Sequence, residues 1–354
     1  MGKSLRKGRG VGRLVLPLVL SLSTTVACQM TQAIRGGDDL EFPRVGGSER
    51  FTFTGLVSTI AFSKGGRVLA VGGCRAVDSG GSAPCTRGVV YVRNLNGTGP
   101  ETSYTLPRAV TALAVSPDGS RWVAGDAEGH LILSTDAKRV GSGPFRQKGE
   151  ITALTFSPDG KWVASGSLDS SFPLGFLDMV TGGVLKPSMQ FEPVSALAFS
   201  PDGKDLAVGM TNGRLVVWDF TSRSMPVRVT PNSGERYAIT RTTFSSDGRL
   251  LAYGRRDGKV VIVDRGSGHS LVEFTGSSAV SALAFSPDGR YVALGQDNGR
   301  VLLVKSQEAQ QIWSKRHILP VADLAYSLDG TSLAVAVQHS VYLYSVDGGA
   351  LQHR

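Results

Sequence analysis

The stretch VSALAFSPDGKDLAVGMTNGRLVVWD, residues 194–219, decides the fold of this chain. In its first six residues, 194–199, large side chains at the fourth and sixth positions alternate with small ones at the third and fifth, a period of two that is typical of a β-strand. In Ser-Pro-Asp-Gly, 200–203, the Pro and the Gly favour a type I turn into a second apolar strand. Asn212-Gly213 tolerates the positive φ of a two-residue hairpin, and 214–219 follows as a third strand.

The same unit recurs seven times, and each complete copy ends in a more polar fourth strand such as 225–229 or 270–274. The Ser-Pro-Asp-Gly turn is intact in four copies and varied in the copies whose turns begin at Ser63, Ser245 and Ser327. The final glycines of the seven turns stand at 66, 119, 160, 203, 248, 289 and 330, so the intervals are 53, 41, 43, 45, 41 and 41 residues. A period of about 40–45 residues with four short strands is the signature of a propeller blade.

The last copy lacks its fourth strand, because few residues remain after 341–344. A β-prone stretch without a place in the repeats, Phe51-Thr52-Phe53, precedes the first copy. We therefore predict an all-β fold, a seven-bladed β-propeller of four-stranded antiparallel blades over residues 49–354, closed by this N-terminal strand, which completes the last blade. Such closure removes exposed sheet edges and ties the two chain ends together.

The repeats resemble the WD40 β-propeller family over about residues 49–346. One copy has a true Trp-Asp pair, Trp218-Asp219, and equivalent places carry pairs such as Leu177-Asp178 and Val263-Asp264. The Gly-His that precedes the first strand in the family is absent, so we do not expect the family's buried His-Asp network. The corresponding polar residues are expected to serve as turn residues: Glu128, Asp169, Asn212, Asp257 and Asn298.

The N-terminus has the pattern of an export signal. Five cations and no acid occupy the first 13 residues, and an apolar run of 14 residues, Leu14 to Ala27, follows. A membrane span needs about 20 apolar residues, so residues 1–27 are predicted to be a signal peptide. The ending Thr25-Val26-Ala27-Cys28 resembles a bacterial lipobox, although Thr25 stands where Leu is usual, and this resemblance implies lipidation of Cys28. Ordinary cleavage after Ala27, which would leave Cys28 free, is the alternative.

Residues 28–48 are polar and Gly-rich without a sustained period, and we predict a flexible tether with a reach of about 25 Å. Gln29 is not the Asp that resembles an inner-membrane retention signal, which favours the outer membrane, with the propeller facing the periplasm. Cys74 and Cys85 lie together in a Gly/Ser-rich insertion in the first repeat. In an oxidising compartment such a pair is expected to form a disulfide.

Charge and composition narrow the partner classes. The chain has 38 Lys and Arg against 29 Asp and Glu, a net charge of +9, but without the five cations of the signal the balance falls to +4. We therefore expect no nucleic-acid partner. The histidines lie in different copies or at the tail, with no catalytic or metal-binding spacing: His130, His269, His317, His339 and His353. We expect no enzyme activity, no metal and no cofactor.

The strongest anomaly lies at the third position of the innermost strand. Five copies carry a small residue there, whereas the fifth carries Arg241 and the seventh Asp323. Strands near the axis have little room, so we expect both side chains to point into the channel and to pair across blade six. One interpretation is an ion pair that fixes blade packing. The other is a site at the channel mouth that grips a polar ligand or a partner side chain.

Two further features are candidate interfaces. Trp313 lies in a predicted outer strand flanked by cations, which is the composition of an interface anchor. Cations around the hairpins at one end of the propeller favour an acidic partner or anionic headgroups, with an ordinary solvated surface as the alternative: Arg214, Arg255, Arg256, Lys259 and Arg300. Trp122 and Trp162, which begin second strands, are expected in the core.

Together these features predict a membrane-tethered scaffold or adaptor that binds proteins in a bacterial cell envelope. A periplasmic sensor that binds a ligand or a glycan at the channel mouth is the first alternative. A propeller hydrolase or lyase is the second.

Overall fold

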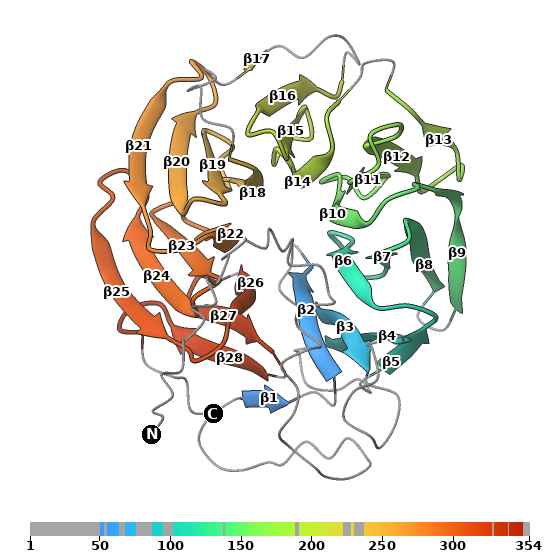
Figure 1. Ribbon diagram of the computed structural model, residues 1–354, viewed down its shortest axis with the longest axis horizontal. Helices are drawn as coiled ribbons and strands as arrows, with labels where there is room; N and C mark the ends of the chain where they lie inside the picture. The colour runs from blue at the N-terminus through green and yellow to red at the C-terminus, as the bar shows by residue number, and fades with distance from the viewer. Residues whose placement is uncertain are drawn as a thin grey trace, which may run out of the picture.

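The computed structural model describes residues 50–52, 55–63, 68–75, 87–94, 102–136, 139–187, 191–221, 228–229, 237–327, 329–338 and 340–349. Throughout this part of the chain the regular structure is β, in seven four-stranded antiparallel sheets arranged as a ring (Figure 1). The prediction of an all-β, seven-bladed propeller is confirmed.

Each blade runs outward from an inner strand at the axis. The first four blades are β2(Gly55–Phe62), β3(Val68–Arg75), β4(Arg87–Asn94) and β5(Thr102–Leu106); β6(Val110–Val115), β7(Trp122–Asp126), β8(His130–Asp136) and β9(Arg139–Arg146); β10(Ile151–Phe156), β11(Trp162–Ser167), β12(Leu174–Asp178) and β13(Val184–Leu185); and β14(Val194–Phe199), β15(Asp205–Met210), β16(Leu215–Asp219) and β17(Arg228–Val229).

Blades five to seven follow the same order. They are β18(Ile239–Phe244), β19(Leu250–Arg255), β20(Lys259–Asp264) and β21(Ser270–Thr275); β22(Val280–Phe285), β23(Tyr291–Gln296), β24(Arg300–Lys305) and β25(Gln311–Arg316); and β26(Val321–Tyr326), β27(Ser332–Val337) and β28(Ser340–Ser345), with β1(Arg50–Thr52) as outer strand.

The ring closes as the sequence predicts. Strand β1 pairs with β28 in antiparallel register, with Phe51 opposite Val341 and Thr52 opposite Ser340. The junction between the last and first blades gains a backbone hydrogen bond, in which Val57 N donates to Gln338 O at 2.6 Å. Strands from the two ends of the chain therefore complete one sheet.

The repeated turn is held by its own side chains. In blade three, Ser157 Oγ donates to Asp159 Oδ1 at 2.5 Å, and Trp162 N donates back to Ser157 Oγ at 2.9 Å. Gly160 closes this turn with φ +70°, a value that glycine adopts without strain. The same Ser to Asp hydrogen bond recurs in the turns that begin at Ser116, Ser200, Ser245, Ser286 and Ser327.

Neighbouring blades approach closely at a glycine of the second strand in blades one to six, whereas β27 of blade seven has Ala336 at this place. A Cβ on Gly166 would lie 2.5 Å from Val194 Cγ1 of the next blade, closer than carbon atoms can pack. Five other glycines meet a β-branched residue of the next inner strand in the same way: Gly72 against Val110, Gly125 against Ile151, Gly209 against Ile239, Gly254 against Val280 and Gly295 against Val321. This close apolar packing joins the blades into one ring.

A hydroxyl at the second position of the inner strand ties blades together as well. Thr152 Oγ1 donates to Gly166 O in its own blade at 3.2 Å and to Val194 O of the next blade at 2.6 Å. The ladder between β10 and β11 shifts register at this residue, as it does at the same place in the other blades. Ser58, Thr111 and Ser195 make the same pair of contacts. We call this contact the hydroxyl latch.

The two tryptophans that begin second strands pack in the interior between neighbouring blades, in agreement with the predicted core position. Trp122 is buried, with its ring 5.1 Å from that of Tyr104. Trp162 is half-buried and meets Phe220 edge-on, with ring centroids 5.8 Å apart.

Candidate functional site

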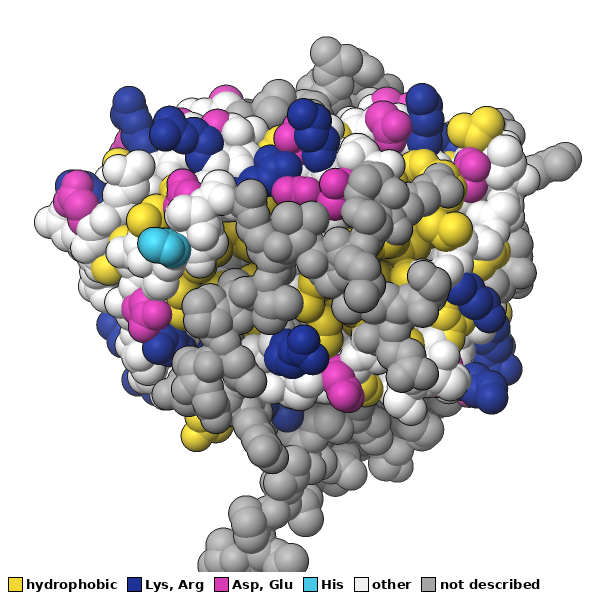
Figure 2. Space-filling view, turned by 90° about the horizontal axis from the view of Figure 1, so that it is seen from above, with side chains coloured by type: hydrophobic (Ala, Val, Ile, Leu, Met, Phe, Trp, Pro, Cys, Tyr) yellow, Lys and Arg dark blue, Asp and Glu magenta, His cyan; other side chains and the backbone are white. Residues whose placement is uncertain are grey.

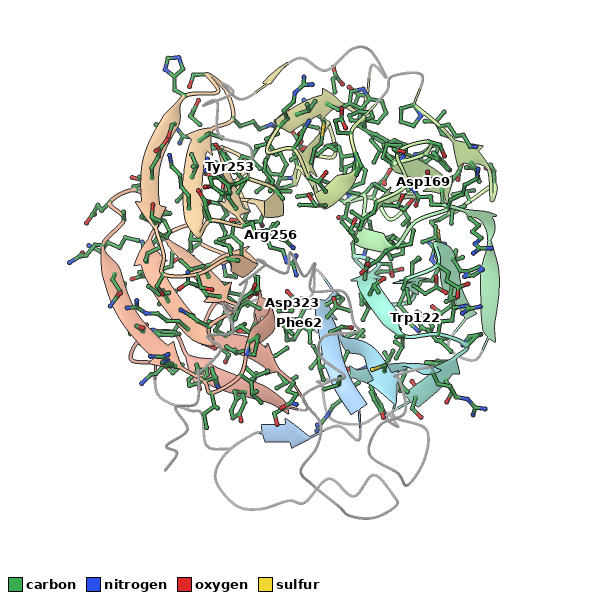
Figure 3. The ribbon with its side chains drawn as sticks, viewed as in Figure 1. Phe62, Trp122, Asp169, Tyr253, Arg256 and Asp323 are labelled. Carbon is green, nitrogen blue, oxygen red and sulfur yellow. The ribbon has the colours of Figure 1, made fainter. Side chains whose placement is uncertain are left out.

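The charged residue of blade seven lies in the wall of the axial channel (Figure 3) and joins this blade to blade one. Asp323 Oδ2 accepts hydrogen bonds from Ile60 N at 2.9 Å and from Thr59 Oγ1 at 3.2 Å, both on β2. Its Oδ1 accepts from Leu324 N at 2.9 Å. The carboxyl keeps a little accessible surface toward the channel, yet protein surrounds it, and this burial raises its pKa despite the nearby charge of Arg241.

The reason for this arrangement lies one residue earlier. Blade seven has Ala322 where other blades have Ser or Thr, so it cannot form the hydroxyl latch. Asp323 reaches across the same junction instead. Of the two interpretations drawn from the sequence, the structural one describes the contacts of Asp323.

Arg241 belongs to the other side of the channel. Its Nη1 donates to Thr240 O of its own strand at 2.7 Å. Among the described residues, the hydrogen-bond partners of Asp323 come from blades seven and one, so the two side chains do not pair directly as predicted. The guanidinium acts at longer range, since its charge lowers the pKa of Asp323 and of Asp297.

Arg256, which directly follows β19, and Asp297, which directly follows β23, add to this group of charges. Arg256 is exposed and points into the channel in Figure 3. Burial raises the pKa of Asp297, and the charges of Arg241 and Arg256 oppose that rise. Analysis of the sequence assigned Arg256 to the rim and missed Asp297. The signal that could have found both is the hairpin position after each second strand, which is Leu168 and Thr211 in blades three and four.

The channel wall is therefore unequal around the ring. We define the channel-mouth cluster as Arg241, Arg256, Asp297 and Asp323, which come from blades five to seven. Blades two, three and four place alanine at the third inner position: Ala112, Ala153 and Ala196. One half of the wall carries charge, and the other half carries methyl groups.

The cluster opens toward one end of the ring, which we call the hairpin face. It consists of the hairpins between second and third strands and the connections from each outer strand to the next inner strand: 107–109, 127–129, 147–150, 168–173, 191–193, 211–214, 237–238, 256–258, 276–279, 297–299 and 317–320. The opposite end carries the Ser-x-Asp-Gly turns and is called the turn face.

Arg255 requires a correction, because it is not part of an exposed rim. Only 4% of its surface is exposed. Its Nε donates to Asp257 Oδ1 at 3.1 Å, and the guanidinium lies 5.4 Å from the centroid of the Tyr237 ring. The last residue of a second strand faces the interior, where Asp126, Ser167 and Gln296 are also buried. Arg255 is therefore a structural residue.

The other rim cations differ in how far they are engaged. Arg214 and Arg256 are exposed. Lys259 Nζ lies 2.8 Å from Glu273 Oε2, and Arg300 Nε donates to Ser314 Oγ at 3.0 Å. Arg214 and Arg256 thus remain the two rim cations that face solvent.

Trp313 also requires a correction, because its indole is 8% exposed. Its Nε1 donates to Val346 O at 2.9 Å, and its ring lies 6.1 Å from that of Tyr344. The segment after β28 covers the outer strand β25 here, so a Cβ on Gly349 would lie 3.0 Å from the indole. Trp313 anchors blade seven on blade six and is not an exposed interface residue.

The hairpin face carries apolar residues that the sequence analysis did not single out. Ile318 is fully exposed, Tyr237 is 51% exposed and Leu168 is 41% exposed. They come from loops of blades six, five and three, so they stand on different sides of the ring. Each stands in a loop, where strand periodicity gives no indication of exposure.

The turn face is polar. Arg265 joins two acids of blade four, with Nε 2.8 Å from Asp205 Oδ2 and Nη2 3.2 Å from Asp202 Oδ1. Beside it lie crevices of about 560 Å³ and 690 Å³, at the junctions of blade five with blades four and six. On the edge of the ring seen in Figure 2, cations and anions are interspersed, and no large area of one sign is visible.

The remaining predictions fall partly outside the described residues. Cys28, Cys85, the predicted signal peptide and the predicted tether lie there, as do His339 and His353. Cys74 is a buried disulfide cysteine, and its pairing with Cys85 stays a prediction. Within the described ranges, no three His, Cys, Asp or Glu side chains group in a way that could hold a metal. The same ranges contain no helix long and apolar enough to cross a membrane.

Comparison with known proteins identifies the repeat. The family described as "WD domain, G-beta repeat" matches residues 139–172, 185–219 and 268–304. Each match begins at or near the outer strand of one blade and continues into the inner strands of the next.

A curated relative is the "Periodic tryptophan protein 2 homolog" of Schizosaccharomyces pombe, which is 34% identical over 118 residues. The aligned part covers 32% of this chain and 13% of that protein, so the chain corresponds to a small part of the relative's length. Together with the closed ring of seven four-stranded blades, these matches show that the chain is a WD40-repeat β-propeller.

Proposed function

We propose that this protein is a non-enzymatic scaffold that binds partner proteins on its hairpin face while a lipid on Cys28 holds it at a bacterial membrane. WD40 propellers generally mediate protein–protein interactions, which supports the first half of the proposal. Fold alone does not assign a function, so the proposal depends on the site.

The observation that carries it is the set of exposed apolar side chains on one end of the ring. Leu168, Tyr237 and Ile318 stand on three different loops of the hairpin face. Burying a side chain of this size contributes about 1.5–3 kcal/mol. Single exposed apolar residues are common on protein surfaces, but three of them on one end face, beside exposed arginines, fit a protein interaction site.

Charge adds to this arrangement. Arg214 and Arg256 are exposed on the same face. Arginine beside aromatic and aliphatic groups is the composition of interface hot spots, and it favours a partner with acidic residues.

The membrane tether is inferred from the sequence. The basic and apolar N-terminal pattern, the lipobox-like ending at Cys28 and the polar segment 28–48 support a lipoprotein of the cell envelope, which we assign to the outer membrane facing the periplasm. Strand β1 begins at Arg50 on the outer edge of blade seven (Figure 1), so a tether joined there starts at the rim of the ring. Attachment at the rim is compatible with a partner on either end face.

The experiment is co-purification from membranes in mild detergent. We expect a stoichiometric protein partner with the unaltered chain, and its loss with Tyr237→Ala or Ile318→Asp. Val180→Asp is the matched control, because Val180 is 73% exposed on the turn face. A bound small molecule, or turnover of an envelope polymer, would instead favour the sensor or the hydrolase.

The tether is tested separately. Replacing Cys28 by Ala should release the protein from the membrane fraction. If the variant pellets with membranes as before, lipid anchoring is wrong, and the scaffold proposal stands without it.

A further inference from the structure

We propose that Arg241 and Arg256 form a subsite in the channel mouth that takes the carboxylate of an acidic side chain from the partner protein. This inference rests on the proposed scaffold function and specifies the partner's chemistry. It follows from the hydrogen bonds that the four charged side chains of the channel-mouth cluster make and from the donors that they leave available.

Arg241 is fixed in place and keeps donors available. Its Nη1 is held by Thr240 O at 2.7 Å, which keeps the guanidinium beside strand β18. Among the described residues, Nε and Nη2 have no hydrogen-bond partner. A guanidinium with donors left over is suited to a carboxylate, which it can bind through two parallel hydrogen bonds.

Arg256 supplies the second cation. It directly follows β19 and is exposed at the channel mouth, where its side chain points toward the axis (Figure 3). Its charge and that of Arg241 both act on Asp297, which places the two guanidinium groups around one region of the channel.

The two carboxylates of the cluster do not cancel these cations equally. Both oxygens of Asp323 are occupied by hydrogen bonds at the junction with blade one. Asp297 has no side-chain hydrogen bond among the described residues, and burial raises its pKa. Burial raises the pKa of both acids, so each is more readily protonated than an ordinary Asp, and among the described residues neither lies within hydrogen-bond distance of Arg241 or Arg256. The two cations are therefore left open to a further carboxylate.

The opposite wall leaves room for the incoming group. Ala112, Ala153 and Ala196 present no side chain beyond Cβ at the third inner position. Leu168 stands at the mouth on this side, and Tyr237 on the side of blade five. The chemistry that fits is an acidic residue flanked by apolar residues in an exposed segment of the partner.

A pair of peptides tests the inference on the full chain in mild detergent. The probe is fluorescein-labelled Leu-Glu-Leu-Glu-Leu, and the control peptide has Gln in place of both Glu. We expect the Glu peptide to bind about tenfold more tightly, since a hydrogen bond to a charged group typically has an effect of this size. Fluorescence polarisation gives both affinities.

Three variants locate the effect. Arg241→Gln and Arg256→Gln should each bring the two peptides to within about twofold of one another, whereas Arg214→Gln should keep the preference, because Arg214 lies on the same face outside the channel-mouth cluster. Arg256 is exposed, so its variant remains decisive even if Arg241→Gln fails to fold. Equal binding of both peptides by the unaltered chain would overturn the inference. So would a preference that survives both channel variants or disappears with Arg214→Gln.

Two further outcomes separate this inference from the scaffold itself. If free glutamate displaces the Glu peptide as well as the unlabelled peptide does, the subsite takes a small carboxylate and the assignment to a partner is wrong. If the partner co-purifies equally with Arg241→Gln and Arg256→Gln, the subsite is wrong but the scaffold stands. If no partner co-purifies with the unaltered chain, the scaffold itself fails, whatever the peptides do.

Discussion

The ring has two groups of junctions that differ. The first group joins blades one, two, three, four and five in turn, and the second joins blade five to six, six to seven and seven back to one. In the first group, a Ser or Thr at the second inner position forms the hydroxyl latch to the next blade. In the second group, Thr240 bonds within its own blade, Ser281 Oγ is buried without a hydrogen-bond partner among the described residues, and Ala322 has no hydroxyl. The channel-mouth cluster lies beside this second group.

The apolar contacts do not follow this division. Gly254 meets Val280 and Gly295 meets Val321 as closely as the glycines of the earlier blades meet theirs. Close packing against a glycine is thus shared by blades one to six, whereas the polar contacts at the axis vary. The polar contacts at the axis can therefore differ from blade to blade and serve a function, while the packing between blades keeps the ring closed.

The largest effect is expected where a single carboxylate replaces the latch. Asp323→Ala leaves Ile60 N and the Thr59 hydroxyl without their acceptor at the closing junction. We expect a loss of about 3 kcal/mol in the free energy of unfolding, because buried polar groups are left unpaired. Urea denaturation measures it, and a loss below 1 kcal/mol, the usual net value of one hydrogen bond, would show that the strand pairing of β1 suffices for closure.

The next effect tests the close packing between neighbouring blades. Gly166→Ala forces a methyl group to within 2.5 Å of Val194 Cγ1, and we expect about 2 kcal/mol of destabilisation from overpacking. Gly348→Ala is the matched control, because nothing lies within 4 Å of its added Cβ. If the two variants unfold at the same temperature, the blades are not packed as closely as the contacts indicate.

A smaller effect compares two identical hexapeptides. Residues 194–199 and 280–285 both have the sequence VSALAF, but Ser195 Oγ donates to Gly209 O and Ile239 O, while Ser281 Oγ has no partner in the part of the chain that the structure describes. Ser195→Ala should cost about 1 kcal/mol, and Ser281→Ala should be close to neutral. Equal losses in chemical denaturation would remove the distinction between the two groups of junctions.

Much of the fold could be predicted from the sequence, because it depends on features that repeat. The alternation of large and small residues, the Ser-Pro-Asp-Gly turn and the unpaired stretch at 51–53 predicted seven blades and their closure. The antiparallel pairing of β1 with β28 confirms the predicted closure, and the structure adds its register, with Phe51 opposite Val341. A one-residue error in such a pattern would reverse the two faces of a strand, so patterns of this kind are strongly informative.

The candidate site was harder to predict, because exposure depends on neighbours from other blades. Trp313 has polar and charged neighbours in the sequence, yet the segment after β28 buries it. Arg255 precedes the exposed Arg256 directly, yet its side chain contacts Asp257. Asp323 was identified as an anomaly, but its partners on β2 lie more than 260 residues away along the chain. Only the closed ring brings these residues together.

The smallest effect concerns acidity and contrasts the repeated turns with the channel. The hydrogen bond from Ser116 and those from Ser120 lower the pKa of Asp118 from 3.8 to about 2, whereas burial raises the pKa of Asp297. The unfolded chain then binds more protons than the folded one at Asp118, so the stabilisation from this turn is present above pH 3.8 and is lost as the pH falls toward 2. Ser116→Ala removes the hydrogen bond that contributes most to the low pKa of Asp118 and should raise that pKa, while the pKa of Asp297 stays unchanged in the same NMR titration.

The opposite pH dependence is expected at Asp297, because its pKa is raised in the folded chain. Its contribution to stability weakens as the pH rises above the ordinary Asp value, and Arg256→Gln should raise its pKa further. An Asp297 pKa at or below the ordinary Asp value would mean that this carboxyl is not buried as the structure indicates.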